Sequence, residues 1–119
     1  MKLRHMVGAL GLMALAAAAA DEPPWEVAGR QGIVRNVIVP TEQARDREAY
    51  ARQIPLLCGT PEQSCFLNFY TNSSGVPLAM PLPDAIQGEA TAIFRRSTKQ
   101  GAELFRWACR VQPGTEGCF

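Results

Sequence analysis

Four cysteines constrain the fold of this 119-residue chain more than any other feature: Cys58, Cys65, Cys109 and Cys118. Their spacings lack the C-x-x-C pairs of zinc ribbons, so a metal site built from four thiolates is not expected. A short chain buries little apolar surface, and small exported domains compensate with disulfides. An even number of cysteines therefore predicts two disulfides, provided that the chain reaches an oxidising compartment.

The first twenty residues have the three parts of a secretory signal peptide. Met1–His5 carries two basic residues, residues 6–15 form an apolar run too short to span a bilayer, and Ala16–Ala20 offers an A-x-A cleavage site. No cysteine follows Ala20, so lipid attachment is not expected. We expect cleavage after residue 20 and a bacterial protein that is periplasmic or secreted, where thiols oxidise and no membrane span is left.

Three disulfide pairings are possible with four cysteines. The local pairing, Cys58–Cys65 with Cys109–Cys118, closes two short loops and ties down two segments that would otherwise be loose. A pairing of Cys58 with Cys109 and of Cys65 with Cys118 would instead join the end of a helix to the sheet. We favour the local pairing over either alternative.

The mature composition excludes several classes of function. Without its twenty leader residues the chain retains 99 of 119, enough for one small domain. Ten basic residues then face eleven acidic ones, so the net charge of −1 gives no electrostatic reason to bind nucleic acid. The sole histidine, His5, leaves with the leader, so no Ser-His-Asp or Cys-His arrangement can form. We predict a protein that is not an enzyme and needs no cofactor or metal.

The start of the mature chain predicts a flexible arm followed by a strand. Residues 21–32 contain Pro23, Pro24 and two glycines, which is typical of extended and loosely held segments. Trp25 is the exception, because one large aromatic side chain can pin such an arm to a domain. Ile33–Val39 is rich in β-branched residues and predicts the first strand.

Two helices are predicted from their start and stop signals. Thr41 can cap a helix that begins at Glu42. Pro55 should kink or stop this helix near Gln53, because proline lacks the N–H that a helical hydrogen bond requires. A capping-box pattern followed by a terminating glycine predicts a second helix over residues 84–101.

Two further segments alternate in polarity and predict strands, Cys65–Tyr70 and Leu104–Val111. In the first, the odd-numbered residues should face the core, whereas Phe66 and Tyr70 should face outward. The resulting β-α-β-α-β order predicts a small two-layer α+β domain over residues 33–119, with about three strands and two helices, stapled by two disulfides.

The loop Val76–Pro83 is the most unusual stretch of the mature chain. Its prolines favour the stiff polyproline II conformation, so Leu78, Met80 and Leu82 could present a preformed apolar ridge to a partner. The alternative is a connector whose apolar side chains pack over the edge of the core.

A cluster of basic residues lies within sixteen positions: Arg95, Arg96, Lys99, Arg106 and Arg110. These side chains could bind an anionic partner. The alternative is a solvated face balanced by Glu89 and Glu103. Phe66 and Tyr70 either extend this basic surface or are covered by the arm through Trp25, and we favour the cover.

These features lead to one functional hypothesis and two alternatives. The leading hypothesis is an exported, non-catalytic binding, inhibitor or immunity-type module that contacts a periplasmic or envelope protein. Its predicted contact residues are Leu78, Met80, Leu82, Arg95, Arg96, Arg106 and Arg110. The first alternative is a thiol-disulfide or envelope-stress protein that uses Cys58 and Cys65. The second is a small hydrolase built on Asp84, Glu89 and Glu103, for which so short a chain can hardly enclose a cleft.

Overall fold

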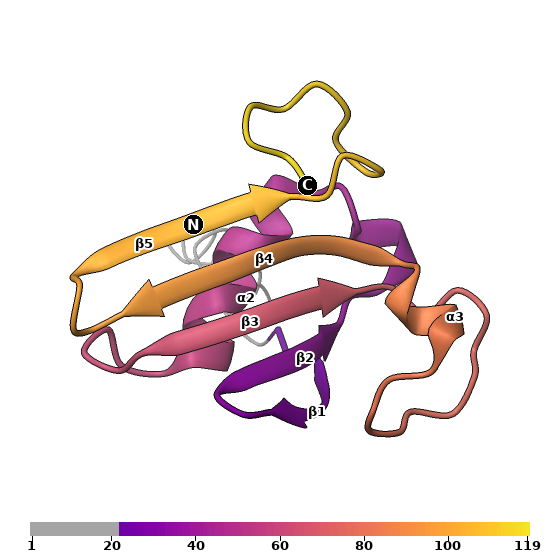
Figure 1. Cartoon of the computed structure of the whole chain (residues 1–119), viewed down its shortest axis with the longest axis horizontal. Helices are drawn as coiled ribbons and strands as arrows, with labels where there is room; N and C mark the ends of the chain where they lie inside the picture. The colour runs from indigo at the N-terminus through magenta and orange to yellow at the C-terminus, as the bar shows by residue number, and fades with distance from the viewer. Residues whose placement is uncertain (1–21) are drawn as a thin grey trace, which may run out of the picture.

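The computed structural model describes residues 22–119, so the predicted signal peptide lies outside the described residues. These residues form a small α+β domain built on a five-stranded sheet (Figure 1). The prediction of about three strands was therefore wrong. In chain order the elements are β1 (Glu26–Gln31), β2 (Val34–Ile38), the 3-10 turn η2 (Thr41–Gln43), α2 (Arg47–Cys58), β3 (Cys65–Tyr70), α3 (Asp84–Gln87), β4 (Ala90–Ser97) and β5 (Ala102–Trp107).

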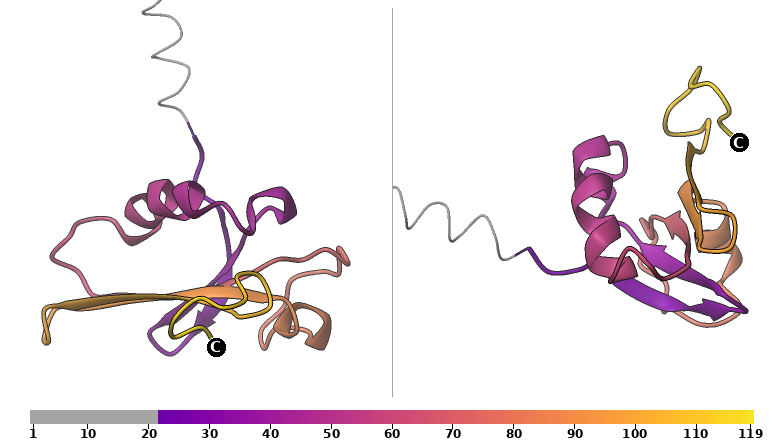
Figure 2. Two further views of the ribbon diagram at one scale, coloured as in Figure 1. Left: turned by 90° about the horizontal axis from the view of Figure 1, so that it is seen from above. Right: turned by 90° about the vertical axis from the view of Figure 1, so that its left-hand side faces the viewer.

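The five strands lie side by side in chain order, from β1 to β5. β2 and β3 are parallel, and every other neighbouring pair is antiparallel. Parallel strands cannot be joined by a tight turn, so the chain crosses the sheet between β2 and β3, and α2 forms this crossover. α2 covers one face of the sheet and creates the second layer, whereas α3 lies at the end of the sheet (Figure 2).

β1 is formed by residues expected to belong to the flexible arm. Gly32 has a φ of 60° and closes a tight hairpin between β1 and β2. Trp25, just before β1, donates its backbone N–H to Gln53 Oε1 (2.7 Å) and its indole N–H to Gln43 Oε1 (3.0 Å). The expectation that Trp25 anchors this segment is confirmed. Pairing with β2 also holds residues 26–31 in an ordered strand. Composition alone does not reveal this pairing.

The first helix begins later than predicted. Thr41 lies in the turn η2, and Asp46 is the residue that caps α2. The Asp46 carboxylate accepts hydrogen bonds from the backbone N–H groups of Glu48 (3.1 Å) and Ala49 (3.3 Å). An aspartate at this position satisfies donors that have no partner within the helix, so it outcompetes the earlier threonine.

The first helix also ends later than predicted, because it continues through Pro55 to Cys58. Proline removes one helical hydrogen bond there, but the extra turn buries Leu57 and brings Cys58 to Cys65. Gly59, with a φ of 77°, then ends the helix and donates its N–H to the Pro55 carbonyl (3.1 Å). The burial and the disulfide outweigh the local preference to stop near Gln53.

The second predicted helix is a single turn, and most of its residues form β4. The turn begins at Asp84 as predicted but ends at Gln87, whereas residues 90–97 pair with β3 and β5. β4 contains Thr91, Ile93 and Phe94, which favour strands. The apolar spacing of this segment also fits a helix, but pairing with a strand on each side makes it a strand.

Tyr50 lies at the centre of the core between α2 and the sheet. Its ring makes edge-to-face contacts with Trp25, Phe69, Phe105 and Trp107 at centroid distances between 4.9 and 5.6 Å. These aromatic side chains come from the N-terminal segment, α2, β3 and β5. The core thus joins elements far apart in the sequence.

The two faces of β3 carry different side chains. Cys65, Leu67 and Phe69 are buried toward α2, whereas Phe66 and Tyr70 lie half-buried on the other face, so the predicted alternation is confirmed. Because the Trp25 ring packs against Phe69, it lies on the α2 face of the sheet. The prediction that Trp25 covers Phe66 and Tyr70 was therefore wrong.

Both disulfides are local, as favoured from the sequence. Cys58–Cys65 joins the end of α2 to the start of β3, and Cys109–Cys118 closes the C-terminal loop. The described residues contain no free cysteine. Each bridge restricts a short loop in the unfolded chain, which favours the folded state.

Candidate functional site

The proline-rich loop packs against the sheet face that α2 leaves uncovered. The Met80 side chain lies on Gly29, and its sulfur accepts from Asn36 Nδ2 at 3.9 Å. Leu82 is buried and Leu78 is half-buried, whereas Met80 is 37 % exposed. The loop therefore places much of its apolar surface on its own domain, which supports the connector alternative over a free ridge.

The guanidinium groups of Arg96 and Arg110 donate hydrogen bonds to backbone carbonyls of their own chain. Arg96 donates to the carbonyl of Thr60 and to that of Gln63, both at 2.9 Å. Arg110 donates to the Ala90 carbonyl, at 3.0 Å from Nη2. These intramolecular hydrogen bonds give both arginines a structural role, so no binding partner is needed to account for them.

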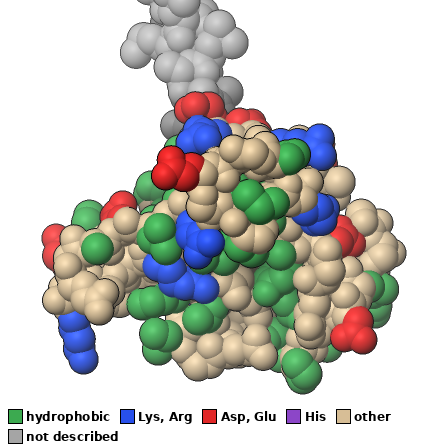
Figure 3. Space-filling view, turned by 45° about the horizontal axis from the view of Figure 1, so that its top comes forward, with side chains coloured by type: hydrophobic (Ala, Val, Ile, Leu, Met, Phe, Trp, Pro, Cys, Tyr) green, Lys and Arg blue, Asp and Glu red, His purple; other side chains and the backbone are tan. Residues whose placement is uncertain are grey.

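Arg95 and Arg106 lie on the opposite sheet face from Arg96. Arg95 stacks on the Phe66 ring and donates to Asn68 Oδ1 (2.8 Å), while burial lowers the pKa of its guanidinium. Arg106 donates to a backbone carbonyl of the C-terminal loop. The predicted arginines therefore do not form one patch, and basic side chains are dispersed over the surface seen in Figure 3.

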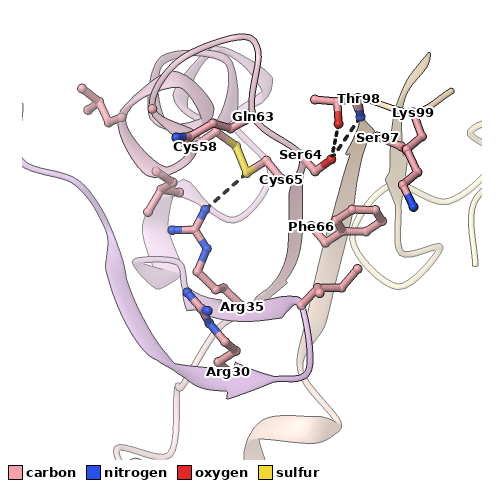
Figure 4. A pocket seen from close by; sticks show the side chains of 14 residues that line it. Arg30, Arg35, Cys58, Gln63, Ser64, Cys65, Phe66, Ser97, Thr98 and Lys99 are labelled. Carbon is pink, nitrogen blue, oxygen red and sulfur yellow. Dashed lines mark hydrogen bonds between the residues drawn. A yellow bond between two sulfur atoms is a disulfide. The ribbon is translucent and has the colours of Figure 1, made fainter. Parts of the chain in front are cut away.

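A different set of basic residues lines an open cleft of about 740 Å³ at the end of the sheet that carries the Cys58–Cys65 disulfide, which is called the disulfide end below (Figure 4). The β1–β2 hairpin supplies Arg30 and Arg35, and the β4–β5 turn supplies Lys99. The Cys58–Cys65 disulfide also lines the cleft. None of the lining residues is acidic.

Arg30 and Arg35 are directly opposite each other in the β1–β2 ladder. Like charges at such positions destabilise a hairpin, because their side chains share one face at close range. Within residues 22–119, no carboxylate oxygen lies within 4.0 Å of the side-chain nitrogens of Arg30, Arg35 or Lys99. Figure 4 shows the two guanidinium groups next to each other and directed into the cleft. The cleft is a cationic site that no described acidic residue neutralises.

Apolar side chains flank these charges. Ile33, at the tip of the hairpin, is 70 % exposed, and Leu56, in the last turn of α2, is 50 % exposed. Both line the cleft together with Phe66. The cleft thus combines a charged pair with apolar surface, a combination that suits a protein segment better than a free inorganic anion.

Sequence reasoning did not find Arg30 and Arg35. Their segment reads as a loose arm up to Gly32, so the two arginines fall in different predicted elements. The available signal was the hairpin itself: Gly32 lies between two short apolar-polar segments, and two arginines at matching distances from the turn become cross-strand neighbours. Lys99 was part of the predicted basic cluster, but only the turn between β4 and β5 brings it to this cleft.

The carboxylates considered for hydrolysis do not converge. Glu103 faces Arg96 across the sheet at 4.0 Å, whereas Glu89 precedes β4 at the other end of that strand. Partial burial acts to raise the pKa of Glu89. Hydrogen bonds from the Thr71 hydroxyl (2.6 Å) and from the backbone N–H and hydroxyl of Ser73 outweigh this effect, so the pKa is lowered. Asp84 starts α3. The three carboxylates therefore lie in separate parts of the fold.

Comparisons of this chain with protein-family models, curated proteins and solved structures found no match. No helix within residues 22–119 is long and apolar enough to cross a membrane. The same residues contain no cluster of three or more histidine, cysteine or acidic side chains that could hold a metal ion.

Proposed function

We propose that this protein is an exported, non-catalytic binding module, and that its contact surface is the cationic cleft. Its partner is a segment of a periplasmic or envelope protein that carries carboxylates next to apolar side chains. The observation that carries the proposal is the Arg30–Arg35 pair, which is placed side by side without a described carboxylate partner.

The charge pair carries the proposal because it works against stability in the free protein. An incoming carboxylate accepts hydrogen bonds from both guanidinium groups and offsets the repulsion between them. Relief of this repulsion, which destabilises the free protein, then favours the bound state. Ile33 and Leu56 add apolar contact beside the charges. The two disulfides are consistent with an oxidising compartment, which supports export.

The test is a calorimetric titration of the mature protein with an acetylated peptide in which glutamate and leucine alternate. Arg30→Gln and Arg35→Gln should each weaken binding by about tenfold. Arg45→Gln is the matched control, because Arg45 is exposed outside the cleft and the variant loses the same charge. Absence of wild-type binding, or equal weakening by the control, contradicts the proposal.

A thiol-disulfide role is the second candidate, favoured by one contact. Arg35 Nη2 donates to Cys65 Sγ at 3.4 Å, and a positive charge there stabilises a Cys65 thiolate. Attack of an external thiolate on the Cys58 sulfur would then release Cys65 as the leaving group and form a mixed disulfide. The low exposure of both cysteines, 5 % and 2 %, opposes this role.

Equilibration with glutathione redox buffers tests the second candidate. A redox role predicts a Cys58–Cys65 bridge that glutathione reduces readily, and an Arg35→Gln bridge that is harder to reduce. A bridge that stays oxidised in the wild type under these conditions is structural.

A further inference from the structure

β5 is the last strand of the sheet, and part of its outer edge has no partner (Figure 1). The Ala108 N–H donates to the Thr91 carbonyl (2.8 Å), toward the β4 side. Because backbone groups alternate along an antiparallel strand, Trp107, Phe105 and Glu103 direct their N–H and C=O groups outward. Within residues 22–119, no hydrogen bond uses the outward backbone groups of Phe105 and Glu103.

One residue of the chain itself already pairs with this edge. Phe119 donates its N–H to the Trp107 carbonyl (3.1 Å), and its own carbonyl accepts from the Cys109 N–H (2.7 Å). These two bonds form a one-residue bridge on the outer side of the chain at Ala108. The outward groups of Phe105 and Glu103 continue the same line and are free to pair with another chain.

An apolar pocket of about 220 Å³ lies beside this edge, on the sheet face that α2 covers. Its lining residues come from α2, β4 and β5: Arg47, Tyr50, Ala51, Ile54, Phe94 and Phe105. Side chains directly opposite each other in neighbouring strands share a face. A residue added opposite Phe105 therefore places its side chain next to this pocket.

The pocket also carries one uncompensated charge. Arg47 stacks over the Trp107 ring at 5.9 Å, and no described carboxylate forms an ion pair with it. A carboxylate next to an apolar residue in an added strand would meet this guanidinium. The backbone edge, the pocket and the charge together specify an extended peptide.

We propose that the β5 edge is a strand-addition site for an extended segment of another protein. That segment pairs its backbone with Glu103 and Phe105, places a large apolar side chain in the pocket and directs a carboxylate to Arg47. The site is separate from the cationic cleft, which α2 and the β1–β2 hairpin line at the disulfide end.

The test uses 15N-labelled mature protein and the peptide acetyl-Thr-Asp-Thr-Phe-Thr-Val-Thr-amide. We expect the amide signals of Glu103 and Phe105 to shift and their hydrogen exchange to slow on titration. Replacing phenylalanine in the peptide by alanine, or methylating its backbone nitrogen, should each weaken binding by about tenfold.

Protein variants separate the edge from its charge. Glu103→Pro removes an outward N–H while the bonds to β4 stay intact, and it should weaken binding by about tenfold. Glu103→Gln keeps the N–H and should bind within about twofold of the wild type. Should the proline variant not fold, the N-methylated peptide makes the same distinction.

Three results would overturn the proposal. The first is the absence of shifts at Glu103 and Phe105 at millimolar peptide concentrations. The second is a set of shifts confined to Arg30 and Arg35, which would assign the peptide to the cationic cleft. The third is a concentration-dependent shift of the β5 amides without peptide, which would assign the edge to a second copy of this chain.

Discussion

The Tyr50 hydroxyl lies 2.9 Å from the Thr91 hydroxyl, across 41 residues of sequence, and joins the first turn of α2 to the start of β4. The same phenol donates to the Ala44 carbonyl at 2.7 Å. Thr91 is fully buried and Tyr50 is 1 % exposed. This network fixes α2 over the sheet, and its loss leaves polar groups without water or partner.

We expect Tyr50→Phe to lower the free energy of unfolding by about 1–3 kcal/mol, because a buried hydroxyl and a carbonyl lose their shared partner. Urea denaturation of the disulfide-intact protein measures this change. Tyr70→Phe is the control, since the half-buried Tyr70 hydroxyl makes no side-chain hydrogen bond within residues 22–119, and its effect should stay within about 0.5 kcal/mol. Equal losses in the two variants would contradict the assigned role.

Stability should also depend on pH through Tyr50. Burial raises the pKa of Tyr50 from 10.0 to about 12, because the ionised phenol is disfavoured in the core. The folded protein therefore holds this proton to a higher pH than the unfolded chain does. The resulting stabilisation is complete below pH 10 and is lost as the pH rises toward 12.

Denaturation between about pH 9 and 11 checks this dependence. Above pH 10 the wild type should lose about 1 kcal/mol per pH unit more than Tyr50→Phe, which lacks the ionisable group. Parallel pH profiles for the two proteins would show that Tyr50 does not titrate with a raised pKa.

Gly29 is expected to tolerate no side chain while Met80 occupies the sheet face. A Cβ at position 29 would overlap Met80 Cγ and lie 2.6 Å from Met80 Sδ. Gly29→Ala should therefore destabilise the protein by about 1–3 kcal/mol. In a Met80→Ala background the same substitution should cost less, and a double-mutant cycle of thermal unfolding measures the difference.

Gly88→Ala is the matched control for this experiment. Gly88 has a helical φ of −73°, and a Cβ there would meet only the Asp84 carbonyl oxygen at an ordinary 3.7 Å. Its effect should stay below about 1 kcal/mol. An additive cycle for positions 29 and 80 would mean that the loop does not pack on β1 in solution.

Arg30→Gln should raise the free energy of unfolding by about 0.2–1 kcal/mol, because it removes one of two like charges directly opposite in a hairpin. Added salt should narrow this difference by screening the repulsion in the wild type. Arg45→Gln loses the same charge at an exposed site outside the cleft and should leave stability nearly unchanged. A loss of stability in Arg30→Gln would indicate a structural role for the arginine.

Local signals predicted the strands β2 and β3 and the disulfide cross-links correctly. β2 (Val34–Ile38) lies within the predicted segment, and β3 (Cys65–Tyr70) has the predicted bounds. Both segments combine β-branched or aromatic residues with clear boundaries, so the preference of the chain and its burial agree. The local disulfide pairing was favoured correctly because short loops close at low entropic cost.

Where local signals were weak or in conflict, contacts with neighbouring elements of the fold determined the conformation. β1 carries a proline-rich prefix and a glycine in its middle, yet it pairs with β2, with a bulge between Val27 and Gly29, because a hairpin needs only a suitable turn. Residues 90–97 have apolar spacing that fits a helix, but β3 and β5 on either side each offer a ladder of hydrogen bonds. Pro55 stays helical because the next turn buries Leu57 and Cys58.

By itself, the sequence determined a small α+β domain, the strands β2 and β3 and two local disulfides. Only the tertiary structure decided the five-stranded sheet and the surfaces that it presents. Arg30, Arg35 and Lys99 share a cleft because strand pairing and a turn bring them together, and the β5 edge is open because no described strand follows it. Local preference acts over a few residues, whereas such sites form from contacts between residues that are distant along the chain.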